Sequence, residues 1–302
     1  MKKIVVAGGS GFLGEVLKKY FKSKYQEIVI LSRSTQAPEN NIRYVQWDGK
    51  SLGSWAETLD GCEVLINLAG KSVDCRYTPR NKQLIYDSRL DSTRVLGEAV
   101  QACQCPPQVW INSSSATIYR HAQDRAMDET QGEIGSGFSV DVVKKWEKAF
   151  WSVETPQTRK LALRTAIVLG KKLGALQPLK RLTQAGMGGK QGDGNQYFSW
   201  IHERDFARVV EYLIQEQNLQ GVVNVSAPNP IPNKELMQTM RKIIGAPFGI
   251  PLGKNLLELG AKVIQTETEL ILKSRWVIPR KLQENGFRFH FSDIHAALED
   301  LL

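Results

Sequence analysis

A glycine-rich segment near the start of the chain has the residue types and spacing that bind phosphate groups. Gly8, Gly11 and Gly14 follow a short apolar segment and precede a stretch with helical periodicity. In a strand-to-helix turn, Gly8 permits the tight turn, Gly11 lets the backbone approach a pyrophosphate, and Gly14 allows the helix to pack closely on the strand. The helix N-terminus adds N–H groups and a positive dipole. This glycine turn (residues 8–14) therefore predicts a dinucleotide site that includes Phe12 and Leu13; a purely structural turn is the alternative.

The residues at the end of the second predicted strand indicate which dinucleotide binds. Ser32 and Arg33 stand there, and Arg33 lies nineteen residues beyond Gly14. A protein specific for NAD usually carries an acidic residue at this place, which holds the ribose 2′-hydroxyl. An arginine pairs instead with a 2′-phosphate through charge-assisted hydrogen bonds, and a serine adds a hydroxyl donor. We therefore expect NADP(H) as the cofactor, with an idle surface arginine as the alternative.

The elements that must position the glycine turn alternate regularly along the first part of the chain. Short apolar or β-branched segments predict strands, and segments of helical length separate most of them. Strands are expected at 3–7, 27–31, 42–46, 63–67, 108–112 and 161–169, and helices at about 79–102 and 139–153. Apolar strands separated by helices indicate a parallel sheet that is covered on both faces. The expected fold class is α/β, a Rossmann-type doubly wound sheet with a smaller, mostly helical C-terminal substrate lobe.

The regular alternation weakens after about residue 170, where glycine and proline become frequent. We expect an NADP(H)-binding domain over residues 1–170 and a substrate-side, C-terminal lobe over residues 171–302. A late strand near 222–225 is expected to return to the main sheet. The glycine-rich loop at 186–196 is expected to close over a substrate, because glycines allow the backbone to come close.

The composition argues against several classes of protein. Its 42% hydrophobic and 24% charged residues are typical of a globular chain, and the four cysteines form no C-x-x-C pair, so we expect reduced thiols and no metal site. No apolar run is long enough to cross a bilayer, so we expect a cytoplasmic protein without a membrane partner. The net charge is +9, but the basic residues are scattered, which argues against a nucleic-acid partner. A small-molecule substrate and a monomer or homodimer are expected.

Longer segments spread over almost the whole chain carry a more specific pattern. They are 8–14, 47–48, 67–70, 76–78, 88–89, 113–119, 146–147, 164–170 and 200–202, with Asp205. Together they resemble the extended short-chain dehydrogenase/reductase superfamily. Within this superfamily, the chain is similar to an atypical group of proteins that resemble NAD-dependent epimerases and dehydratases. The proteins of this group have their own C-terminal domain.

The resemblance implies roles for individual residues. The segment after the fourth strand would pass beside the adenine ribose and pyrophosphate, one arginine of the long helix would lie near the cofactor, and one valine would line its nicotinamide end. Small residues at the carboxyl end of a strand also lie where ligands bind in open α/β sheets. The cofactor residues implied in this way are Leu68, Ala69, Gly70, Arg89 and Val168.

The catalytic pattern of that superfamily is present only in part. Ser115 matches the serine that bonds the substrate oxygen. The following helix of active members carries Y-x-x-x-K, in which the tyrosine is the acid/base group and the lysine lowers the pKa of the tyrosine. Counting back from Trp146 places Ser139 and Val143 at these two positions. The standard mechanism therefore does not apply to this chain.

Several residues could replace the missing pair. Tyr119, four residues after Ser115, is the predicted acid/base candidate, and a packing or substrate-wall role is its alternative. A lone histidine such as His202 is more often a structural hydrogen-bonding residue than a catalyst. Further candidates for acid/base chemistry or substrate contact are Lys71, Arg76, Trp200 and His202.

Two functions are consistent with these patterns. The first is an NADP(H)-dependent oxidoreductase or epimerase with atypical acid/base groups, acting on a small polar or sugar-nucleotide-like substrate. The second is a catalytically silent module that binds NADP(H) and senses its redox state. Ser115 favours the enzyme, and the missing tyrosine and lysine favour the sensor.

Overall fold

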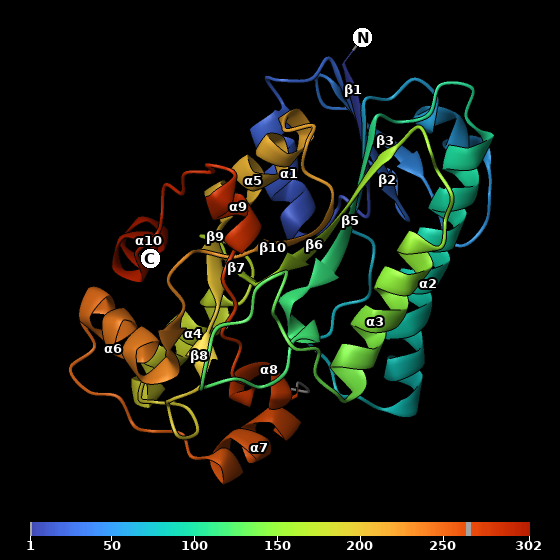
Figure 1. The fold of residues 1–302 in the computed structure, drawn as a ribbon. Helices are drawn as coiled ribbons and strands as arrows, with labels where there is room; N and C mark the ends of the chain where they lie inside the picture. Colours follow the sequence, from blue (N-terminus) through green and yellow to red (C-terminus); the bar gives the residue numbers. More distant parts are fainter. Residues whose placement is uncertain (1, 264–266) are drawn as a thin grey trace.

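The computed structural model describes residues 2–263 and 267–302, and a seven-stranded sheet forms its centre (Figure 1). Every neighbouring pair of strands in this sheet is parallel. In spatial order the strands are β10 (Gly221–Val225), β6 (Arg159–Thr165), β5 (Val109–Ser115), β4 (Val64–Asn67), β1 (Lys3–Ala7), β2 (Glu27–Ser32) and β3 (Ile42–Gln46). The chain winds outward from β1 in both directions, so the strand order reverses between β1 and β4. Ligands of such sheets bind outside the carboxyl ends of the strands at this point.

Helices cover both faces of the sheet (Figure 1). Helices α1 (Phe12–Phe21) and α5 (Glu203–Gln215) contact each other on one face. Helices α2 (Pro79–Ala102) and α3 (Phe138–Trp151) and the 3-10 helix η1 (Ser54–Leu59) lie on the other. Helix α2 begins where it does because the Thr78 hydroxyl accepts a hydrogen bond from the Asn81 N–H and Pro79 follows at the first helical position.

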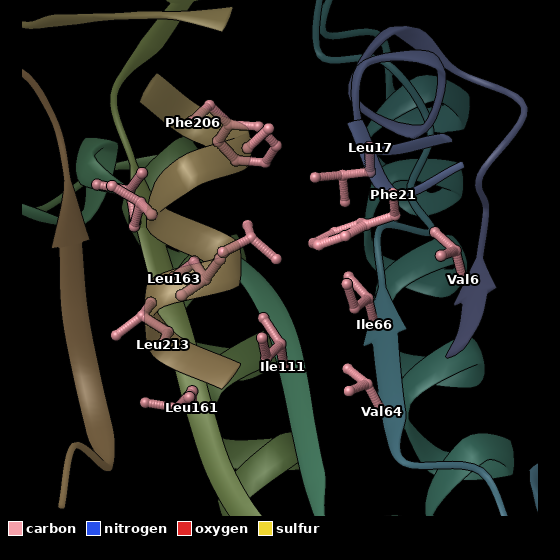
Figure 2. Close-up of a cluster of buried hydrophobic side chains, with 14 of the residues drawn as sticks. Val6, Leu17, Phe21, Val64, Ile66, Ile111, Leu161, Leu163, Phe206 and Leu213 are labelled. Atoms are coloured by element: carbon pink, nitrogen blue, oxygen red, sulfur yellow. The ribbon is translucent and has the colours of Figure 1, made fainter. Parts of the chain in front are cut away.

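The core under α1 and α5 holds these helices on the sheet. Leu17 and Phe21 of α1, Phe206 and Leu213 of α5 and Ile66 of β4 belong to one buried cluster (Figure 2). Burying one such side chain stabilises the fold by about 1.5–3 kcal/mol. The cluster therefore fixes α1, and with it the glycine turn that precedes the helix.

The C-terminal region is mostly helical, as expected. Helices α4, α6 and α10 surround a second core that includes Trp200 and Met237. Two small two-stranded sheets pair β7 with β9 and β8 with β11. The elements are η2 (Ala116–Ile118), β7 (Ile167–Leu169), α4 (Leu176–Leu182), η3 (Thr183–Met187), β8 (Tyr197–Phe198), β9 (Trp200–His202), β11 (Ile231–Pro232), α6 (Asn233–Ile244), α7 (Lys254–Val263), α8 (Glu269–Leu272), α9 (Arg280–Glu284) and α10 (Ile294–Leu301).

The expected fold class is confirmed, and one predicted strand was wrong. The segment 161–169 is not one strand, because β6 ends at Thr165 and β7 begins at Ile167. The Ala166 N–H still donates to the Val225 carbonyl of the main sheet, whereas the Ile167 N–H donates to the Ser199 carbonyl. β7 then pairs with β9. The sequence does not mark this change of sheet, because buried apolar residues stand on both sides of it, Leu161 and Leu163 in β6 and Leu169 in β7.

The late strand predicted near 222–225 is confirmed, since β10 pairs in parallel with β6. Helix α5 precedes it and packs on α1. Residues 203–225 thus contact the first part of the chain, and the division at residue 170 stays a prediction. Among the described residues, no helix is both long enough and apolar enough to cross a membrane.

Candidate functional site

The glycine turn between β1 and α1 has the geometry that its spacing predicts. Gly8 has a φ angle of +71°, which L side chains rarely adopt, and a Cβ atom there would lie 2.7 Å from the Ala69 Cα atom. A Cβ atom on Gly14 would lie 2.1 Å from the Gly9 carbonyl oxygen, so the helix packs directly on the turn. Gly11 differs, because the nearest atom to its Cβ position is 4.0 Å away. The turn therefore presents bare backbone at Gly11.

Helix α1 begins at Phe12, and no side chain caps Gly11. The first N–H groups of an α-helix have no partner within the helix and carry the positive end of its dipole, so they bind anions such as phosphate. The turn and the helix start therefore fit the pyrophosphate of a dinucleotide.

A cavity of about 490 Å³ opens at this turn. It lies at the carboxyl ends of β1, β4 and β5, where the strand order reverses. The cavity brings most of the predicted site residues together. Those that line it are Gly8, Gly11, Phe12, Leu13, Gly14, Leu68, Ala69, Gly70, Lys71, Arg89 and Ser115.

Arg89 of α2 forms one wall of the cavity. Its guanidinium donates hydrogen bonds of 3.0 Å to the Lys71 and Ile85 carbonyls and lies over the Trp146 ring at 5.0 Å. Burial lowers the pKa of Arg89 to about 10, and the group keeps its charge at neutral pH. A Cβ atom on Gly70 would lie 3.2 Å from the Arg89 Cζ atom. Arg89 thus places a fixed positive charge against the turn that follows β4.

Ser32 and Arg33 lie beside the cavity and not in its lining. The Gly8 N–H donates to the Leu31 carbonyl at 2.8 Å, so the end of β2 adjoins the glycine turn. Ser32 is buried and its hydroxyl donates to the Ser34 carbonyl at 2.5 Å, whereas Arg33 is exposed. Arg33 therefore follows a strand end that adjoins the glycine turn, and its contact with a 2′-phosphate stays a prediction.

Val168, predicted at the nicotinamide end, is also outside the cavity lining. It belongs to β7, is 8% exposed, and packs into the core shared with α1 and α5. Its proposed contact with the cofactor stays a prediction.

Ser115 lines the same cavity as the glycine turn and stands where β5 ends. Its hydroxyl accepts a hydrogen bond from the Thr117 N–H at 3.2 Å, which starts the short helix η2. The next serine back, Ser114, donates to Glu147 at 2.6 Å, and Glu147 in turn forms two 2.8 Å hydrogen bonds with Arg164. This buried network fixes the end of β5 and therefore the position of Ser115.

Tyr119 does not line the cavity. Helix η2 turns the chain, so that Tyr119 is 1% exposed in a separate hydrophobic cluster. Its hydroxyl donates to Asn224 at 2.9 Å and accepts from Arg164 at 3.0 Å. Burial raises the pKa of Tyr119, and the Arg164 charge opposes this effect. This position corrects the predicted acid/base role and favours the packing role given as its alternative.

Trp200 and His202 also lie away from the cavity, because β9 carries both side chains into the C-terminal core. Trp200 is fully buried and donates from its indole to the Asn229 carbonyl. His202 caps α5, since its Nδ1 atom accepts from the Arg204 N–H at 3.0 Å, and its ring stacks on Phe291. Both positions correct the predicted substrate contacts and agree with a structural role.

Ser139 and Val143 of α3 both line the cavity. The positions of the expected tyrosine and lysine thus face the cavity, but they carry a short hydroxyl side chain and an aliphatic one. The adjacent Lys144 and Lys145 are exposed on the other side of the helix. Neither lysine can act in place of the missing one.

Tyr77 was not among the predicted site residues, but it lines the cavity together with Ser139. Its neighbour Arg76 was a candidate, but Arg76 forms an ion pair with Glu267 at 3.2 Å. The signal for Tyr77 was its place in the segment 76–78, which carries part of the family resemblance. No spacing along the chain connects this segment with α3. In the described part of the chain, no group of three or more His, Cys, Asp or Glu residues could hold a metal ion.

Comparisons with known proteins identify a family for each end of the chain. Residues 4–138 match the NAD dependent epimerase/dehydratase family, and residues 256–301 match a domain of unknown function, DUF1731. An epimerase family protein of Bacillus subtilis, YfhF, is 33% identical over 99% of this chain and 97% of its own. One of Staphylococcus haemolyticus, SH2119, is 31% identical over 100% and 99%.

Solved structures are similar over the same length. The human epimerase family protein SDR39U1, solved with NADPH, has a TM-score of 0.87 at 27% identity and covers 99% of this chain and 98% of its own. A nucleoside-diphosphate sugar epimerase of Corynebacterium glutamicum has a TM-score of 0.78 at 27% identity, and the match covers 100% of this chain and 58% of that one. The resemblance to an atypical extended short-chain dehydrogenase/reductase is confirmed. This chain belongs to the NAD dependent epimerase/dehydratase family, together with the epimerase family proteins that it matches over nearly its whole length.

Proposed function

We propose that this chain binds NADP(H) at the glycine turn and catalyses hydride transfer on a small polar or sugar-nucleotide-like substrate, as an oxidoreductase or epimerase. The observation that carries the proposal is that one cavity extends from Gly8, Gly11 and Gly14 to Ser115. A cofactor that binds at one end would thus adjoin a substrate held at the other. The phosphorylated cofactor is proposed because Arg33 stands at the end of β2, and the similar human protein was solved with NADPH.

Each part of the cavity has a role in this reaction. The N–H groups at the start of α1 would bind the pyrophosphate, and Arg33 would pair with the 2′-phosphate. When bound, the nicotinamide supplies or accepts a hydride. Ser115 would bond the substrate oxygen and hold the reacting carbon toward the cofactor. The network of Ser114, Glu147 and Arg164 keeps Ser115 in place.

The proposal is tested by single-turnover absorbance of bound NADPH. Wild-type protein and Ser115→Ala are mixed with NADPH and a library of small carbonyl compounds, and separately with NADP⁺ and a library of sugar nucleotides. Ser152→Ala is the control, because Ser152 is exposed at the end of α3 and its hydroxyl donates to the Ala149 carbonyl of the same helix. We expect oxidation that Ser115→Ala slows and Ser152→Ala leaves unchanged. No oxidation of NADPH by any carbonyl compound and no reduction of NADP⁺ by any sugar nucleotide would together reject hydride transfer.

A second function is favoured by Ser139 and Val143, which remove the usual acid/base pair from the cavity. The chain would then bind NADP(H) without chemistry and act as a redox sensor. This alternative predicts that NADPH and NADP⁺ change the binding of a partner protein differently. Equal effects of the two cofactors would reject it.

The remaining expectations are proposals of the same kind. We retain an NADP(H)-binding part over residues 1–170 and a substrate-side part over residues 171–302, and the cytoplasmic location, the lack of a nucleic-acid partner and the monomeric or homodimeric state stay predictions.

A further inference from the structure

Tyr77 places a phenol hydroxyl beside the position from which the family tyrosine is missing. The residue lies on the loop between β4 and α2, and its hydroxyl oxygen is 3.5 Å from the Ser139 Oγ atom of α3. Both side chains line the cavity that contains Ser115. A different element of the fold therefore brings a phenol to the same end of the cavity.

The Tyr77 ring is held in this place by its neighbours. It packs edge-on against Phe138 with the ring centroids 4.7 Å apart. Its backbone N–H donates to a Glu267 carboxylate oxygen at 2.7 Å. The next residue, Thr78, caps α2, so the loop ends in a fixed helix start. Contacts on both sides thus direct the phenol into the cavity.

Ser139 connects the phenol to a carboxylate. Its hydroxyl donates to the Glu269 Oε2 atom at 3.0 Å, which leaves an oxygen lone pair of Ser139 to accept from Tyr77. Tyr77, Ser139 and Glu269 therefore form a chain of proton donors and acceptors that starts in the cavity. Glu269 is partly exposed, so protons can reach it from solvent.

The buried Arg275 guanidinium supplies a positive charge that acts on Tyr77. Arg275 is 7% exposed, and its Nε atom donates to the Thr117 hydroxyl at 3.1 Å. Thr117 lines the cavity two residues after Ser115. In the superfamily that the chain resembles, a lysine ammonium has this electrostatic role, and here an arginine from the C-terminal region lies nearby.

The protonation state of Tyr77 depends on all of these groups. Burial is the largest effect and raises the pKa of Tyr77. The hydrogen bond with Ser139 lowers that pKa, the charge of Glu269 raises it, and the charge of Arg275 lowers it. The net effect is an increase, so the phenol carries its proton at neutral pH.

We propose that Tyr77 is the proton donor of the hydride-transfer reaction, with Ser139 and Glu269 as its positioning and relay residues. The inference rests on the proposed function. In the direction of reduction, the substrate carbonyl carbon receives the hydride of the reduced nicotinamide, and the carbonyl oxygen receives the Tyr77 proton. The carbon–oxygen double bond becomes an alcohol, and the tyrosinate regains a proton from solvent through Ser139. Oxidation of an alcohol follows the reverse path.

The test compares Tyr77→Phe with Tyr86→Phe. Tyr86 is a matched control, because its ring also packs edge-on against Phe138 while its hydroxyl bonds Asp141 away from the cavity lining. NADPH affinity is measured by fluorescence titration. NADPH oxidation is followed by stopped-flow absorbance with methylglyoxal and diacetyl, and NADP⁺ reduction with a set of sugar nucleotides. We expect both variants to bind NADPH like the wild type. Tyr77→Phe should lose about a hundredfold to ten-thousandfold in the rate of oxidation, and Tyr86→Phe should not.

Ionisation of Tyr77 gives a readout that does not depend on turnover. The tyrosinate absorbance of the wild type is titrated with pH, and the Tyr77→Phe titration is subtracted. Addition of NADP⁺ should move the Tyr77 ionisation to lower pH, because the positively charged nicotinamide ring would stabilise a nearby tyrosinate. The Tyr86 ionisation, obtained from Tyr86→Phe in the same way, should not move.

The relay is tested with Ser139→Ala and Ser139→Thr. Ser139→Ala breaks the chain from Tyr77 to Glu269, so the dependence of the rate on pH should shift, and Ser139→Thr should restore it because the hydroxyl is kept.

The results distinguish a failure of the role proposed for Tyr77 from a failure of the proposed function. If Tyr77→Phe oxidises NADPH at the wild-type rate, or if NADP⁺ leaves the Tyr77 ionisation unchanged, the role of Tyr77 is rejected while the proposed function stands. If the wild type neither oxidises NADPH with a carbonyl compound nor reduces NADP⁺ with a sugar nucleotide, the proposed function and this inference fail together. A loss confined to Tyr77→Phe, with the expected shift in ionisation, supports both.

Discussion

Replacement of Gly11 and of Gly14 by alanine should separate cofactor binding from stability, although both glycines belong to one motif. A Cβ atom on Gly14 would lie 2.1 Å from the Gly9 carbonyl oxygen, and ordinary contacts begin at 3.4 Å. Helix α1 would have to move by about 1 Å, and overpacking of this kind costs about 1–3 kcal/mol of unfolding free energy. At Gly11 the nearest atom is 4.0 Å away and φ is −89°, so alanine fits. Its loss of stability should stay below about 1 kcal/mol.

Gly11→Ala, which should hardly change stability, should weaken NADPH binding. The methyl group of Gly11→Ala would lie where the pyrophosphate approaches the backbone, so we expect the Kd for NADPH to rise at least tenfold, which is about 1.4 kcal/mol. Urea unfolding without cofactor and fluorescence titration with NADPH measure the two effects. Gly53→Ala is the control, since Gly53 also precedes a helix and its nearest Cβ contact, with Trp55, is 3.4 Å. Unchanged NADPH affinity in Gly11→Ala would show that no pyrophosphate lies over Gly11.

Three other changes test separate parts of the structure. Arg33→Asp should weaken NADPH binding much more than NADH binding in parallel titrations, because only NADPH carries the 2′-phosphate; equal losses would contradict the assignment. Glu147→Gln should lower the unfolding free energy by about 3–5 kcal/mol in urea, because it leaves the buried Arg164 charge without its carboxylate, and a loss below about 1 kcal/mol would show that the pair is not needed. Burial lowers the pKa of His202 from 6.5, and the Asp300 charge opposes this effect. The neutral His202 side chain therefore contributes stability above pH 6.5, and this stability is lost as the pH falls through the lowered pKa of the folded state. His202→Asn, which keeps a helix cap, should remove this part of the acid sensitivity, and identical unfolding profiles from pH 7.5 to about 5 would refute it.

The cofactor end of the cavity could be predicted because its requirements are local. The positive φ angle of Gly8 and the close packing of Gly14 concern a few consecutive residues, and a strand and a helix flank them directly. The parallel sheet was predictable for a similar reason, since strands buried on both faces are continuously apolar. The change of sheet at Ala166 was not, because it depends on β9, which lies more than thirty residues further along the chain.

The other end of the cavity was predicted poorly because proximity along the chain is a weak guide there. Tyr119 is four residues from Ser115, but helix η2 turns it into a buried cluster, where Asn224 and Arg164 bind its hydroxyl. Tyr77 is far from Ser139 in the sequence and lies 3.5 Å from it in the fold. Only the packing of the β4–α2 loop against the start of α3 brings these two hydroxyls together.

The same packing gives the C-terminal domain a direct part in the site. Glu267, Glu269 and Arg275 all lie within residues 256–301, the segment that matches DUF1731. They contact Tyr77, Ser139 and Thr117, respectively, and all three of these partners line the cavity. The residues that line the dinucleotide end thus all lie in the N-terminal half, whereas the polar contacts around Tyr77 need the C-terminal domain. Helix α3 lacks the tyrosine and lysine, but the C-terminal domain brings a carboxylate and a buried guanidinium close to Tyr77 and Ser139. The proposed acid/base chemistry is therefore assigned to the contact between the two parts of the chain, with Tyr77 as the proton donor.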